Sequence, residues 1–75
     1  MSSNPLLEIM VNGEARTFHP DAFPGSLLDL IRLLELTPDQ VVAEINGELV
    51  RRAEAGERRI ADGDRVELVQ FVGGG

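Results

Sequence analysis

The chain contains no cysteine among its 75 residues. This absence excludes disulfide bonds, thiolate nucleophiles and metal sites built on cysteine. A chain of this length forms one domain and buries only about 60% of the surface that its unfolded form exposes. Its stability therefore has to come from one small hydrophobic core and from hydrogen bonds.

Basic residues are few, and none of them is lysine. Seven arginines stand against thirteen acidic residues, which gives a formal net charge of -6. This charge argues against nucleic acid or an anionic membrane as a partner and favours a protein with a basic surface, although solubility alone also explains it. The absence of lysine suits a chain that carries an activated acyl group, but an arginine-rich genome is the simpler explanation.

Long hydrophobic runs are also missing from the chain. No stretch approaches the roughly 20 apolar residues of a membrane span. Residues 1–5 lack the basic and apolar regions of a signal peptide, and we expect them to form a flexible N-terminal extension. We therefore expect no membrane partner and a location in the cytoplasm.

Two Asn-Gly dipeptides, Asn12-Gly13 and Asn46-Gly47, each separate two runs with a strand pattern. Asn-Gly in this position is the strongest short hairpin signal, because both central residues of a type I′ turn need a positive φ. A further strand is expected after the turn at Asp62-Gly63-Asp64. The predicted strands are Leu7–Val11, Glu14–Phe18, Val41–Ile45, Glu48–Val50 and a last one from residue 65 to about residue 72.

One helix is predicted from about residue 27 to residue 36. Ser26 and Asp29 have the spacing of an N-cap hydroxyl and a reciprocating carboxylate, and Pro38 is expected to end the helix. Leu28 and Leu33 widen the apolar stripe, so the helix has to lie against a sheet. The stripe itself has the helical spacing i, i+3, i+4, i+7 and consists of Leu27, Leu30, Ile31 and Leu34.

The order of these elements predicts the fold. One helix on one face of a sheet is the economical way to bury a single helical stripe, and the first and last strands are expected to run parallel at the centre. Residues 51–64 form a long connection with one short helical turn and Ile60 as its large apolar anchor. We therefore predict an α+β chain with the β-grasp fold of ubiquitin over residues 6–72, in which a mixed sheet of four to five strands packs on one helix.

The sequence ends in three glycines, Gly73, Gly74 and Gly75. A tail without β-carbons cannot pack and loses much entropy when it is ordered, so it contributes little to a fold unless another molecule binds it. We expect residues 73–75 to form a flexible tail that ends in a carboxylate, which is an anion at neutral pH. Ordinary fraying of a terminus explains the same residues, so the glycines alone leave their role open.

Several motifs, in their order along the chain, resemble the ThiS family of sulfur carrier proteins. Each motif is weak alone, but their order, the length of the chain and the terminal glycines make the combination fairly specific. The chain departs from the family pattern in residues 51–55, where a proline and an aromatic residue are missing. The matching motifs are VNGE at 11–14, SLLDL at 26–30, AEINGELV at 43–50, DGDRVELV at 62–69 and FVGGG at 71–75.

The resemblance implies that Gly75 is the residue that is modified. In this family an ATP-dependent enzyme similar to ThiF adenylates the terminal carboxylate, and sulfur then displaces AMP to leave a thiocarboxylate. A thiazole synthase similar to ThiG would use this sulfur to build the thiazole half of thiamin. Gly73 and Gly74 would provide reach and clearance in a narrow channel. The chain would then be a monomeric co-substrate that is not an enzyme and binds no cofactor, because the activating enzyme uses the ATP.

The face of the sheet opposite the helix is the predicted docking surface. If Val66 and Leu68 point toward the helix, their neighbours along the strand point away from it. A register shift by one residue would reverse these orientations, and some of the side chains would then only cover the sheet. The predicted partner-binding patch beside the tail consists of Met10, Val42, Val69 and Phe71.

Two alternatives to this function remain at the level of the sequence. A carrier of the same fold that serves molybdopterin synthesis, similar to MoaD, would also end in glycine, although the short chain and its FVGGG ending favour the thiamin pathway. A non-catalytic β-grasp binding module, of the kind associated with RNA, would need no terminal diglycine and would prefer a basic surface. The acidic charge and the glycine ending both argue against this module.

Overall fold

A computed structural model of the chain describes residues 5–71. The predicted glycine tail, Gly73 to Gly75, and residues 1–4 of the predicted N-terminal extension lie outside these residues, as does Val72. Short 3₁₀ turns at Pro20–Ala22, Pro38–Gln40 and Arg52–Glu54 connect the main elements. These main elements are β1 (Leu7–Val11), β2 (Glu14–Phe18), α1 (Leu27–Leu33), β3 (Val41–Ile45), β4 (Glu48–Val50) and β5 (Arg65–Gln70).

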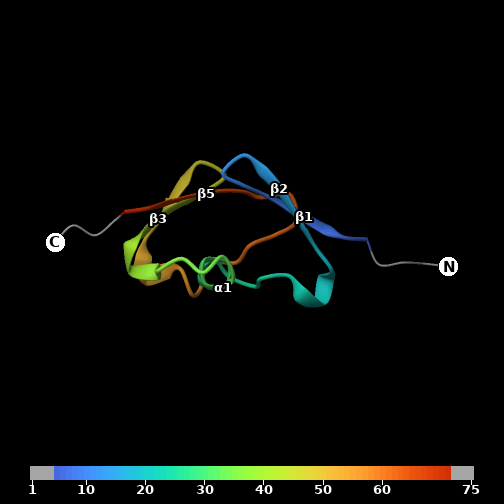
Figure 1. The fold of residues 1–75 in the computed structure, drawn as a ribbon, viewed down its shortest axis with the longest axis horizontal. Helices are drawn as coiled ribbons and strands as arrows, with labels where there is room; N and C mark the ends of the chain where they lie inside the picture. Colours follow the sequence, from blue (N-terminus) through green and yellow to red (C-terminus); the bar gives the residue numbers. More distant parts are fainter. Residues whose placement is uncertain (1–4, 72–75) are drawn as a thin grey trace.

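The five strands form one mixed sheet in the order β2-β1-β5-β3-β4. Strands β1 and β5 run parallel side by side at its centre, and the other neighbours are antiparallel. Helix α1 lies against one face of the sheet, below it in Figure 1. This arrangement confirms the predicted β-grasp fold. We call the face that α1 leaves uncovered the open face.

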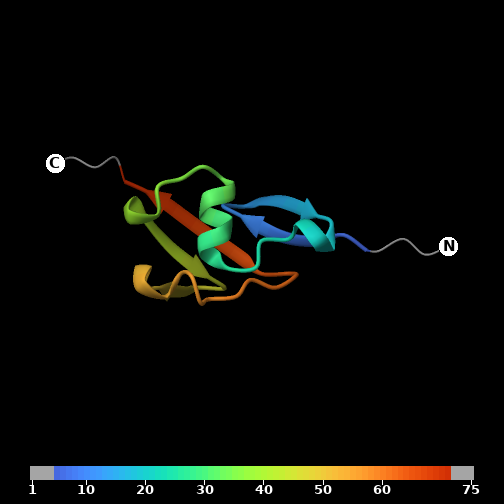
Figure 2. The ribbon, with the colours of Figure 1, turned by 90° about the horizontal axis from the view of Figure 1, so that it is seen from below.

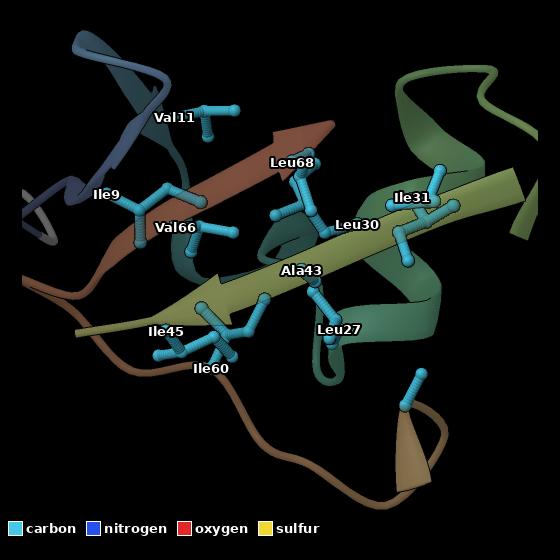
Figure 3. Packing of buried hydrophobic residues seen from close by; sticks show 12 residues of the cluster. Ile9, Val11, Leu27, Leu30, Ile31, Ala43, Ile45, Ile60, Val66 and Leu68 are labelled. Atoms are coloured by element: carbon cyan, nitrogen blue, oxygen red, sulfur yellow. The ribbon is translucent and has the colours of Figure 1, made fainter. Parts of the chain in front are cut away.

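The hydrophobic core fills the space between α1 and the sheet. The helix contributes Leu27, Leu30 and Ile31, which are all buried, as the predicted stripe requires. Figure 3 shows these side chains pointing toward residues of β1, β3 and β5, the inward members of each strand. Within residues 5–71 no helix is long and apolar enough to cross a membrane. The sheet residues of the core are Ile9, Val11, Val41, Ala43, Ile45, Val66 and Leu68.

The connection between β4 and β5 provides hydrogen-bond acceptors for the first N–H groups of α1. Leu27 N–H donates to the Arg58 carbonyl (2.9 Å), and Leu28 N–H donates to the Ala55 carbonyl (3.0 Å). Ser26 Oγ accepts from the N–H of Asp29 (3.1 Å), which confirms the predicted N-cap. The first N–H groups of a helix have no partner inside the helix, so these three bonds satisfy them from outside. Ala55 is buried, as the predicted anchor Ile60 is, so the connection has a second anchor that the sequence did not indicate.

The end of α1 differs from the prediction. The helix stops at Leu33 and not near residue 36, because Glu35 takes a left-handed backbone with a φ of 62°. Its N–H donates to the Arg32 carbonyl (2.9 Å), and the Leu36 N–H donates to the Ile31 carbonyl (3.1 Å). This pair of bonds is a Schellman motif, which ends a helix without any proline. Pro38 instead begins the 3₁₀ turn that leads into β3.

Candidate functional site

Strand β5 carries the chain from the middle of the sheet to its C-terminal end. Figure 2 shows it running diagonally across the sheet, between β1 and β3, with its arrowhead toward the C-terminus. Pairing with β3 continues one residue beyond the strand, since Phe71 N–H donates to the Gln40 carbonyl (2.8 Å). The strand itself ends at Gln70, two residues before the predicted end near residue 72. The body of the protein therefore holds the chain at Phe71, which is four residues before Gly75.

Asn12 joins β5 to the turn between β1 and β2. The direct register between β1 and β5 covers only two pairs, Met10 with Arg65 and Val11 with Val66. After these two pairs, the Asn12 side chain replaces the backbone of β1 as the partner of β5. Its Oδ1 accepts from Leu68 N–H (2.8 Å), and its Nδ2 donates to the Leu68 carbonyl (3.1 Å). The asparagine thus extends the central pairing after β1 has turned away.

Asn46 holds the opposite end of β5 in a similar way. Its N–H donates to the Arg65 carbonyl (2.7 Å), and its Oδ1 accepts from the Arg65 N–H (2.9 Å). Its Nδ2 donates to Asp64 Oδ1 (2.9 Å). The sequence pattern predicted a hairpin turn at each Asn-Gly dipeptide but no further role for the asparagine side chains. The occurrence of asparagine in both turns, where glycine or aspartate also fits, was the only signal of this second task.

Three of the four residues of the predicted docking patch lie together on the open face. Val42 and Val69 are directly opposite each other on β3 and β5, and Phe71 follows Val69 on the same side of the chain. Their exposed fractions are 38%, 61% and 46%, so all three side chains are accessible to a partner. Leu49 on neighbouring β4 lies opposite Glu44 on the same face and is 68% exposed, which was not predicted from the sequence. We call Val42, Leu49, Val69 and Phe71 the apolar patch.

Met10, the fourth predicted member, does not join the apolar patch. It lies opposite Arg65, at the start of β5, whereas Val69 is four residues further along that strand. At about 3.3 Å per residue, the two positions are about 13 Å apart along the sheet. Met10 lies on the open face, as predicted, but it lies near the start of β5 and not near Val69 and Phe71. The prediction differed because the register between two parallel strands cannot be derived from the sequence of either strand.

Acidic side chains lie between Met10 and Val69 on the open face. Glu44 and Glu67 are directly opposite each other on β3 and β5. With Gly47 and Arg65 they line a shallow hollow of about 210 Å³ on the open face. Two like charges opposite each other destabilise a sheet slightly, so this pair is a cost that the fold tolerates. A protein that covers the apolar patch would meet this negative charge at its edge.

A comparison of the sequence with models of protein families identifies a known group. A model of the ThiS family matches residues 9–75, which include every strand residue from Ile9 onward and the three terminal glycines. The chain belongs to the ThiS family. This result confirms the resemblance that the sequence motifs indicated, and it extends the family match through Gly75.

Two relatives of this ThiS-family chain differ in their length. It is similar to the sulfur carrier protein ThiS of Bacillus subtilis, with 31% identity over 67 residues, which are 89% of this chain and 98% of the relative. It is also similar to a thiazole synthase of Paramagnetospirillum magneticum, with 34% identity over 71 residues. Those residues are 92% of this chain but 20% of the synthase, so the chain spans about a fifth of that protein.

Solved structures of a thiamine biosynthesis protein (ThiS) from Geobacter metallireducens have the same fold. The crystal structure has a TM-score of 0.75 and 31% sequence identity, and the match covers 92% of this chain and 100% of that one. The solution structure has the same score and identity and covers 92% and 88% of the two chains. The fold and the family thus agree over nearly the whole length of the chain.

Proposed function

We propose that this chain carries sulfur as a thiocarboxylate on Gly75. At the level of the family, it is a sulfur carrier protein of thiamin biosynthesis. The observation that carries the proposal is the family match, which runs to the last residue and so includes the glycine tail. The structure adds support, because the central strand β5 leads directly toward that tail from a well-packed sheet.

The proposed reaction uses the terminal carboxylate in two steps. A carboxylate oxygen of Gly75 attacks the α-phosphorus of ATP, pyrophosphate leaves, and an acyl adenylate forms. A sulfur nucleophile supplied by a donor then attacks the acyl carbon, and the bond to AMP breaks. A carboxylate is a poor acyl donor and AMP is a good leaving group, so the first step makes the second possible. Glycine at the end lets the backbone take whatever angles the narrow active site requires.

Two partner proteins follow from this reaction. The first is an adenylating enzyme similar to ThiF, which binds and uses the ATP, so the chain acts as a protein co-substrate without a bound cofactor of its own. The second is a thiazole synthase similar to ThiG, which receives the sulfur. A protein named thiazole synthase contains a stretch similar to this chain within its own sequence, and this supports the second partner.

The apolar patch is the surface that we propose for docking. Apolar side chains gathered on an exposed sheet face mark contacts with partners, and Val69 and Phe71 lie directly before the tail. A partner that covers the patch would hold the body of the chain while the tail enters its active site. The acidic residues beside the patch and the net charge of -6 fit a partner surface with basic side chains around an apolar centre.

ATP-pyrophosphate exchange tests the proposed function. The purified chain is mixed with a ThiF-like enzyme and, separately, with the activating enzyme of molybdopterin synthesis, and we expect exchange only with the first. Removal of Gly75 should abolish exchange and leave the fold unchanged, whereas removal of Ser2 at the other end should leave both unchanged. Exchange only with the molybdopterin-type enzyme would overturn the thiamin assignment.

The intact mass of the chain isolated from its native cells tests the thiocarboxylate directly. We expect a species that is heavier by the exchange of one oxygen for one sulfur and that reacts with an alkylating reagent. No cysteine is present to react in its place. If the sulfur-containing mass is absent while the cells are making thiamin, the proposed role of Gly75 is wrong.

A further inference from the structure

The backbone groups of β5 point alternately to its two neighbouring strands. Phe71 N–H donates to Gln40 and the Arg65 carbonyl accepts from Asn46, so these odd-numbered residues face β3. Hydrogen-bonded and non-bonded pairs alternate along an antiparallel ladder. Gln70 and Val41 therefore form a pair without hydrogen bonds between them. The N–H and carbonyl of Gln70 point instead to the β1 side of β5.

On the β1 side, the partners of β5 end before Gln70 is reached. The Val66 carbonyl accepts from Asn12 N–H (2.9 Å), and the Asn12 side chain satisfies both backbone groups of Leu68. The chain then turns back at Gly13 into β2. Within residues 5–71, the N–H and carbonyl of Gln70 have no backbone partner. The central strand thus becomes an edge strand over its last residues.

The Gln70 side chain serves a separate purpose. Its Oε1 accepts from Thr37 N–H (3.0 Å), in the segment between α1 and β3. The side chain therefore anchors the end of β5 on the helix side, while its backbone groups lie in the plane of the sheet. These two functions can be separated by substitution, because one belongs to the side chain and the other to the backbone.

We propose that the backbone of β5 at Gln70 is a site for strand addition. An extended segment of the adenylating partner takes the position that β1 leaves and pairs with the Gln70 N–H and carbonyl. Unpaired groups on a strand edge are a ready template for such pairing. The proposal rests on the proposed function, which requires a partner that grips the chain close to its C-terminus. Gln70 is five residues before Gly75, so this pairing would fix the direction in which the tail leaves the body.

The neighbours of Gln70 favour a polypeptide segment as the occupant. The flanking side chains of Val69 and Phe71 are exposed on the open face, so an added strand would gain cross-strand apolar contacts as well as hydrogen bonds. Main-chain bonds provide affinity in this mode of recognition, and alternate side chains provide specificity. Because the site adjoins the apolar patch, one partner can cover both.

Two substitutions at position 70 separate the backbone from the side chain. Gln70→Pro removes the N–H and fills the vacant edge with its ring, whereas Gln70→Ala removes only the bond to Thr37. Proline is tolerated on an edge strand where its missing N–H would face outward, so we expect both variants to fold. In ATP-pyrophosphate exchange with the ThiF-like enzyme, we expect Gln70→Pro to raise KM at least about tenfold above Gln70→Ala. Equal KM values for the two variants would overturn the proposal.

Hydrogen exchange on the unaltered chain provides a second test that does not depend on the folding of a variant. In the isolated chain, the Gln70 amide should exchange quickly and the Phe71 amide slowly, because only the latter is bonded to β3. Mixing with the ThiF-like enzyme should slow exchange at Gln70 at least about tenfold. Unchanged exchange at Gln70 in a complex that supports ATP-pyrophosphate exchange would overturn strand addition alone. Absence of pyrophosphate exchange with the unaltered chain would instead overturn the proposed function.

Discussion

At the scale of single residues, the two turn asparagines do more than the turns require. Asn12 and Asn46 both take a positive φ, as a type I′ turn needs, and both also bond to β5 with their side chains. Asparagine is suited to both tasks because it tolerates the left-handed region and its amide has a donor and an acceptor. The Asn-Gly pattern therefore predicted the two hairpins correctly but not the bonds that connect them to the central strand.

The substitution Asn12→Asp tests the donor half of this connection. An aspartate keeps the turn and the acceptor for Leu68 N–H, but it places a carboxylate oxygen against the Leu68 carbonyl in place of a donor. We expect the free energy of unfolding in urea to fall by about 1–3 kcal/mol. Asn12→Gly, which removes both bonds without adding a charge, is the comparison that separates the loss of the bonds from the effect of the carboxylate. An unchanged urea midpoint for Asn12→Asp would show that the Nδ2 bond contributes nothing.

At the scale of elements, the helix shows what the sequence could and could not predict. The leucine spacing and the Ser26 cap defined its buried face and its first residue, because both are local patterns. Its end was predicted wrongly, because the termination depends on Glu35 in a backbone region where glycine is usual. No local signal marks a glutamate for this conformation, and the nearby Pro38 offered a simpler explanation for the end of the helix.

The conformation of Glu35 leads to a prediction about stability. A residue with a β-carbon costs about 1–2 kcal/mol in the left-handed region, and glycine avoids this cost. Glycine also makes the unfolded chain more flexible, which offsets part of the gain in stability. We expect Glu35→Gly to increase the free energy of unfolding by about 0.5–1 kcal/mol. Arg32→Gly, inside the same helix, should instead decrease it by about 1 kcal/mol. Chemical denaturation of both variants provides the comparison, and destabilisation by both would contradict the Schellman assignment.

At the scale of the whole molecule, one face of the sheet builds the core and the other presents a surface. Alternation along each strand was enough to predict which residues face α1 and which face away. The sequence could not predict how far apart outward residues lie on different strands, since this depends on register. Met10 and Val69 both point outward, but the register of β1 and β5 places them at different ends of the open face.

The apolar patch is tested by charge substitution at two ends of the open face. Val69→Asp should raise the KM of the chain for a ThiF-like enzyme at least about tenfold, because it buries a charge in the contact. The exposed Val69 side chain makes this variant about as stable as the original chain, as a thermal melt would show. Ala15→Asp, beside Met10 at the other end of the open face, is the control and should leave KM unchanged. Equal effects of the two variants would extend the contact over the whole face.

The central position of β5 also determines how the protein responds to a mechanical force. A partner that drew the last residues into its active site, as proposed, would pull on the middle strand of the sheet. This strand is held by β1 and Asn12 on one side and by β3 and Asn46 on the other. A force along this strand loads many hydrogen bonds in shear at the same time, whereas a force on an edge strand would open them one after another. Residues 65–68 of β5, which are held on both sides, therefore resist such a force without peeling from the sheet.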